Sequence, residues 1–102
     1  LVVWSIFEDS KGRIWVGSQP GNLNVYSPVT QSFKHYNFTD LVESAPNVEM
    51  GIVSITEDNS GKIYFGVTAL YSDEITSTLL FLDEKADKIE KVAAPELSLI
   101  HI

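Results

Sequence analysis

Residues 3–17 read VWSIFEDSKGRIWVG, and residues 52–66 read IVSITEDNSGKIYFG. The two segments start 49 residues apart, and seven of their 15 positions are identical. Five further positions keep their apolar or basic character, as Trp15 and Tyr64 do. Self-similarity at a fixed period is typical of repeat architectures, in which one structural unit recurs along the chain. The sequence is therefore built from tandem units, and the unit sets its fold.

Each unit reads as short strands that alternate with turns. Asp9–Gly12 and its counterpart Asp58–Gly61 combine an Asp that can bond its own turn with a Gly that tolerates positive φ, which is hairpin chemistry. Apolar runs flank both turns, as expected for β-strands. The expected strands are 3–8, 13–18, 22–27 and 32–36 in the first unit and 52–57, 62–68, 78–83 and 88–92 in the second.

A repeat of this length with four antiparallel strands is typical of a β-propeller blade. We therefore expect an all-β propeller fragment, with one blade at 1–51 and a second at 52–98. The apolar segment 99–102 resembles 52–55 and predicts the first strand of a third blade. Because a propeller has about four to eight blades, the expected partners include further blades of the same chain.

Composition excludes several classes of protein. The chain has 102 residues, 44% of them hydrophobic, and a net charge of −7. That hydrophobicity is too high for a disordered chain, and that charge repels nucleic-acid backbones. The absence of cysteine excludes disulfide scaffolds and thiolate zinc sites. No apolar run approaches the roughly 18 residues of a membrane span, so any membrane attachment is expected only through segments beyond this sequence.

The connections that vary in length between the units all fall at one end of the strands. The second unit gains seven residues between its second and third strands, and the first has a long connection at 37–51. Length variation on one face of a repeat array is typical of a binding face. The candidate ligand-binding residues there are Gln19, Asn22, Tyr71, Asp73 and Glu74. Tyr71 could stack on a sugar ring while the two carboxylates accept hydroxyl hydrogen bonds; the alternative is that all five are solvated loop residues.

Other polar residues indicate structure rather than chemistry. The pairs Glu8-Asp9 and Glu57-Asp58 recur at the same turn, whereas catalytic carboxylates occur once per site. His35 and His101 are the only imidazoles, and neither has a second ligand nearby in sequence, so we expect no catalytic residue, metal or cofactor. His35 is expected to be exposed on an outer strand. The positions assigned to the structural repeat motif are Trp4, Asp9, Gly12, Trp15, Gly17, Asp58, Gly61, Tyr64 and Gly66, with the aromatic members packed between blades.

Residues 3–18, followed by Gly21–Pro28 and Phe33–Tyr36, strongly resemble the two-component regulator propeller repeat. The second unit departs from the pattern at Tyr64, where Trp is usual, and at 81–83. The resemblance implies a periplasmic sensor region of a hybrid two-component regulator that recognises oligosaccharides released from polysaccharides. It also implies a homodimer and, beyond this sequence, a β-sandwich, a membrane helix and a histidine kinase.

Two other functions stay open from the sequence. A propeller enzyme of the lyase or lactonase type would need histidine or carboxylate ligands that converge on the central axis. A protein-interaction scaffold would use the same architecture without a small ligand. Both alternatives share the predicted fold and differ only in what binds to it.

Overall fold

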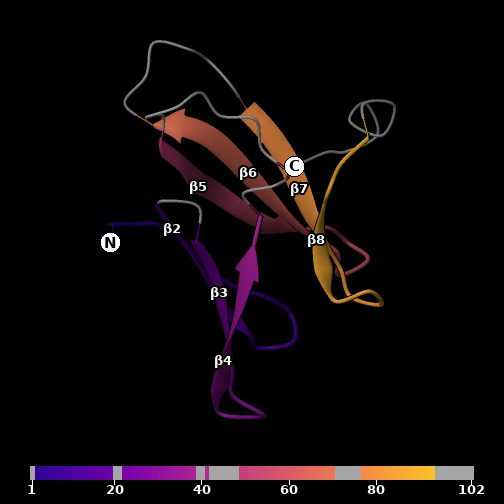
Figure 1. Ribbon diagram of the computed structural model, residues 1–102. Helices are drawn as coiled ribbons and strands as arrows, with labels where there is room; N and C mark the ends of the chain where they lie inside the picture. Colours follow the sequence, from indigo (N-terminus) through magenta and orange to yellow (C-terminus); the bar gives the residue numbers. More distant parts are fainter. Residues whose placement is uncertain (1, 20–21, 39–40, 42–48, 71–76, 94–102) are drawn as a thin grey trace.

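The computed structural model describes residues 2–19, 22–38, 41, 49–70 and 77–93, and these hold two four-stranded antiparallel sheets (Figure 1). The first sheet has the strand order β1-β2-β3-β4 and the second the order β5-β6-β7-β8. The strands are β1 (Val2–Glu8), β2 (Ile14–Gln19), β3 (Asn22–Ser27), β4 (Ser32–Asn37), β5 (Glu49–Glu57), β6 (Ile63–Leu70), β7 (Ser77–Asp83) and β8 (Lys88–Lys91). The predicted all-β propeller fragment with two four-stranded blades is confirmed. The expected strand at 99–102 lies outside the described residues, and the blade limits stay predictions.

One pair of strands is longer than the sequence indicated. β5 begins at Glu49 and β6 ends at Leu70, whereas positions 49–51 and 69–70 were expected in connections. The ladder continues through the pairs Glu49–Leu70, Met50–Ala69 and Gly51–Thr68. Continued pairing satisfies backbone groups that a connection would leave to water, and this outweighs the weak strand propensity of the segment. The connections at this end of the second unit are correspondingly shorter than predicted.

The hairpin turns have the geometry that the sequence predicted. Gly12 and Gly61 have φ angles of +77° and +89°, which glycine adopts without steric cost. The Asp9 carboxylate accepts the backbone N–H groups of Lys11 and Arg13, each at 2.9 Å. These bonds replace backbone partners that the tight turn cannot supply. The first-to-second strand turn is therefore fixed by its own Asp and Gly.

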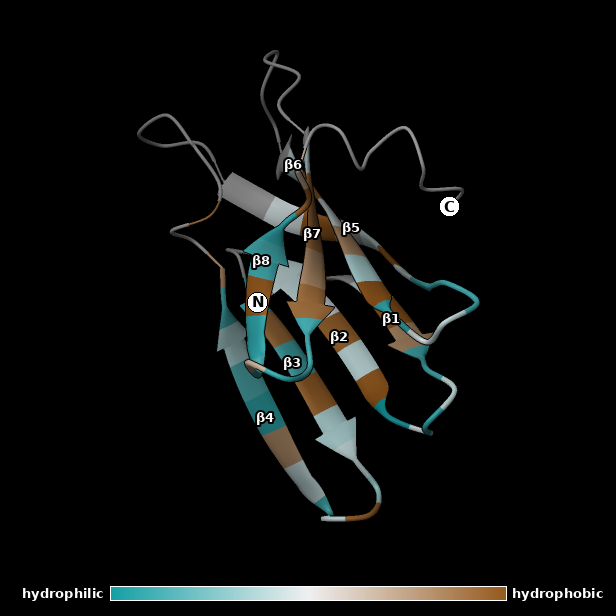
Figure 2. Cartoon of the chain, turned by 90° about the vertical axis from the view of Figure 1, so that its right-hand side faces the viewer, coloured by the Kyte–Doolittle hydropathy of each residue, from teal (hydrophilic) through white to brown (hydrophobic). Residues whose placement is uncertain are grey.

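The two sheets pack face to face through their early strands, and β1 and β2 both contact β5 (Figure 2). Trp15 is fully buried between them, with its ring centroid 5.3 Å from that of Phe65 and 5.9 Å from that of Tyr36. This confirms that Trp15 packs between blades. Tyr64 is also buried, but it lies on the opposite face of the second sheet, because its neighbour Phe65 is the residue that meets Trp15. The side chain of Trp4 lies outside the described residues.

Gly17 lies where the two sheets approach most closely. A Cβ atom at this position would lie 2.7 Å from Ile52 Cβ and 2.6 Å from Ser5 Oγ. At its repeat counterpart, Gly66, a Cβ atom would meet, among the described residues, the side chain of Ser54 alone. Ser5 Oγ also donates a hydrogen bond of 2.9 Å to the backbone carbonyl of Ile52. Ile52 thus packs directly against Gly17, and its carbonyl accepts a hydrogen bond from Ser5 of the first sheet.

Substituting Gly17 by Ala should therefore destabilise the fold more than substituting Gly66 by Ala. Both new methyl groups press on a serine hydroxyl that can rotate, but only the one at Gly17 also overlaps Ile52. We expect a difference of about 1–3 kcal/mol in the free energy of unfolding, as for overpacked cores. Urea denaturation of the two variants measures it, and equal losses would contradict the close approach of Ile52.

Candidate functional site

The antiparallel order gives the molecule two ends that carry different connections. The β1–β2, β3–β4, β5–β6 and β7–β8 turns share one end of the strands, which we call the turn end. The β2–β3, β4–β5 and β6–β7 connections share the other, which we call the loop end. The recurring Glu-Asp pairs and the turn glycines lie at the turn end, and Gln19 and Asn22 border the loop end.

At the turn end, the Asp9 carboxylate is a buried hub with 5% of its surface exposed. Besides the two backbone amides of its turn, it accepts the Trp15 indole N–H at 2.8 Å and the Arg13 Nε–H at 2.7 Å. Burial raises the pKa of Asp9, but the hydrogen bonds from Trp15 and Arg13 and the charge of Arg13 outweigh burial and hold this pKa below its usual value. A carboxylate so fully engaged is a structural anion, as the recurrence of the Glu-Asp pair predicted.

The equivalent carboxylate of the second unit has a different neighbourhood. Asp58 accepts the Ser60 hydroxyl at 2.7 Å and the backbone amides of Ser60 and Lys62 at 2.9 and 3.0 Å. The Ser60 hydroxyl is the main cause of the lowered pKa of Asp58. The Lys62 ammonium lies 4.0 Å from the ring centroid of Phe81, a cation–π distance, whereas the Arg13 guanidinium also pairs with the Asp9 carboxylate. The second hub is therefore more open and lacks a paired guanidinium.

The glutamate of the second Glu-Asp pair makes a contact that sequence reasoning missed. The Glu57 carboxylate accepts the Ser10 backbone N–H at 2.9 Å and the Ser10 hydroxyl at 2.6 Å. Asp58 thus closes its own turn, while Glu57 reaches the turn of the preceding unit. The signal for this role was present in the sequence, since the glutamate recurs with the aspartate, but a sequence does not reveal which turn a side chain reaches.

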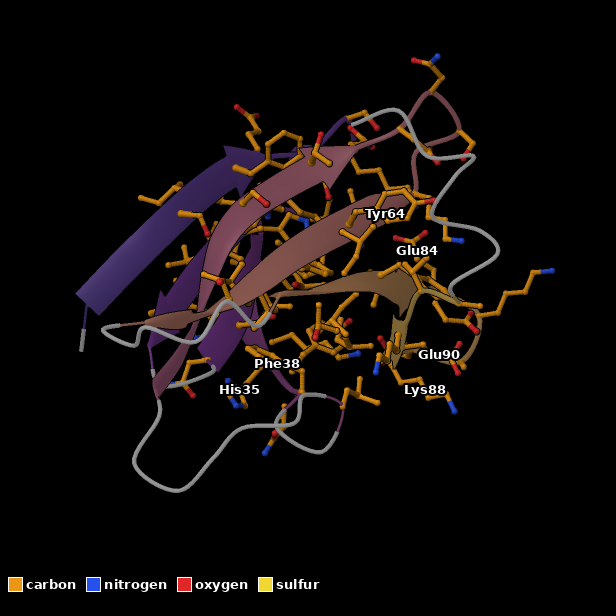
Figure 3. All side chains as sticks on the ribbon, turned by 90° about the horizontal axis from the view of Figure 1, so that it is seen from above. His35, Phe38, Tyr64, Glu84, Lys88 and Glu90 are labelled. Carbon is orange, nitrogen blue, oxygen red and sulfur yellow. The ribbon has the colours of Figure 1, made fainter. Side chains whose placement is uncertain are left out.

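Two acidic residues of the β7–β8 turn also cross to the first sheet. Glu84, labelled in Figure 3, lies in this turn. Its carboxylate accepts hydrogen bonds of 2.7 Å from both Lys11 Nζ and Arg13, and Lys11 is the main cause of its lowered pKa. Asp87 accepts the Tyr36 hydroxyl at 2.7 Å and pairs with the Lys34 ammonium. Acidic side chains of the second unit thus meet basic side chains of the first along the turn end.

At the loop end, the structure describes two of the predicted ligand residues, Gln19 and Asn22, whose backbones lie at the neighbouring ends of β2 and β3. Asn22 is half-buried at the start of β3, where its backbone pairs with Ser18 and Asn37. Gln19 ends β2 with its backbone opposite Val2, and its side chain lies outside the described residues. Tyr71, Asp73 and Glu74 lie outside the described residues as well. Their roles in binding stay predictions.

The remaining chemical candidates are few in the described ranges. His35 is exposed on β4, as predicted, and its Nδ1 lies 3.1 Å from Asn24 Oδ1. His101 lies outside the described residues. Within those residues, no three His, Asp or Glu side chains gather as they would around a metal ion. No helix of the described part is long and apolar enough to cross a membrane.

Comparison with known proteins supports the reading of the first unit. Residues 1–19 match the family model of the two component regulator propeller, which confirms the resemblance seen in the sequence. The matched segment contains β1, its turn and β2, including Asp9, Trp15 and Gly17. No curated protein and no solved structure matches the chain.

Removing the charge of Asp9 should cost more stability than the same change at Asp58. An Asp9→Asn side chain cannot accept from Trp15, Arg13 and the turn amides together, so it leaves buried donors unpaired. We expect a loss of about 3 kcal/mol for Asp9→Asn and about 1 kcal/mol for the more open Asp58→Asn. Urea denaturation of both variants at neutral pH tests this, and equal losses would contradict the role of Asp9 as the hub.

Because the pKa of Asp9 is lowered in the folded chain, the free energy of unfolding should depend on pH in the acidic range. A carboxyl whose pKa is lower in the folded than in the unfolded chain stabilises the fold above its unfolded pKa, about 3.9. This stabilisation is lost as the pH falls below that value and through the folded pKa. The free energy of unfolding should therefore decrease between about pH 5 and pH 3, and Asp9→Asn should flatten that decrease. Denaturation curves across this range measure the slope; an unchanged slope in the variant would rule Asp9 out as a contributor.

Proposed function

Since residues 1–19 carry the two component regulator propeller repeat, we propose that this chain is part of the ligand-sensing propeller of a two-component signalling receptor. In this proposal the propeller lies in the periplasm, in the extracytoplasmic part of an inner-membrane receptor. It binds oligosaccharides derived from polysaccharides and does no chemistry itself. The full-length receptor is a homodimer, and further blades complete the ring around the two described here.

The observation that carries the proposal is the division between the two ends of the sheets. At the turn end, the repeat carboxylates are engaged in bonds within and between the units, as Asp9 and Glu57 are. A carboxylate held by several donors is a poor general base and a poor ligand for a sugar hydroxyl. Ligand recognition is then left to the loop end, where the units differ in the length of their connections.

Each predicted loop-end residue has a defined part in this proposal. Tyr71 provides a flat apolar face for a sugar ring, because the C–H groups on one side of a sugar can stack on an aromatic ring. Asp73 and Glu74 accept hydrogen bonds from hydroxyl groups, and such charge-assisted bonds are the stronger kind. Gln19 and Asn22 of the first unit add amide donors and acceptors. The ligand therefore bridges two neighbouring units.

The test is calorimetric titration of the chain with a panel of oligosaccharides from different polysaccharides. We expect at least one to bind, and the triple variant Tyr71→Ala, Asp73→Asn, Glu74→Gln to weaken that binding about tenfold or more. The matched control is Lys85→Ala, which removes an exposed side chain from a turn at the opposite end and should leave the affinity unchanged.

Three outcomes would contradict the proposal. Heat from no oligosaccharide would favour a protein-interaction scaffold. Turnover of a sugar substrate by a chain with a stoichiometric bound metal would favour a propeller enzyme. Equal loss of affinity in the triple variant and in Lys85→Ala would move the site away from the loop end.

A further inference from the structure

We draw no further inference here: the strongest candidate, a groove of about 400 Å³ along the outer strand β8 between Leu41, Phe81 and Ala93, is walled in part by the face of the second sheet that a further blade of the same chain covers in the proposed ring, and nothing in the structure shows what fills the rest of it.

Discussion

The side chain of Trp15 connects the local structure of the first unit to the packing of the whole. Its indole N–H binds the Asp9 carboxylate, which closes the β1–β2 turn, and its ring contacts Phe65 of the neighbouring sheet. A buried indole needs a hydrogen-bond partner, and Asp9 provides it within the same hairpin. The turn and the inter-sheet core therefore form together. A sheet apolar on both faces needs such a neighbour, because one sheet cannot bury both faces alone.

The basic residue that follows the first turn of each unit has different partners in the two units. In the first, Arg13 pairs with Asp9 and with Glu84 from the second sheet. In the second, Lys62 lies over Phe81 instead. The guanidinium has planar donors that can serve two carboxylates, whereas an ammonium over a ring needs none. The first hub thus includes a contact between units, and the second remains self-contained on an open face.

Contacts that hold the two sheets together lie mainly at the turn end, and the proposed ligand site lies at the loop end. Acidic groups of the second unit meet Ser10, Lys11, Arg13, Lys34 and Tyr36 of the first along the turn end. These contacts join the turns of the second sheet to the first sheet. Rigid scaffolds with variable connections at one end are a common way to vary a binding surface without altering the core.

The sequence by itself determined the repeat, the four-strand unit, the hairpin turns and the structural role of Asp9, because each depends on neighbours close in the chain. It also predicted the burial of Trp15, from its recurrence in register with Tyr64, and the exposure of His35, from its place on an outer strand. Only the tertiary structure decided that Glu57 binds Ser10, that Ile52 is seated on Gly17 and that Tyr64 lies on the face opposite to Phe65 and Trp15. These depend on how one sheet is rotated against the next, and a periodic sequence fixes which residues share a face but not what that face meets.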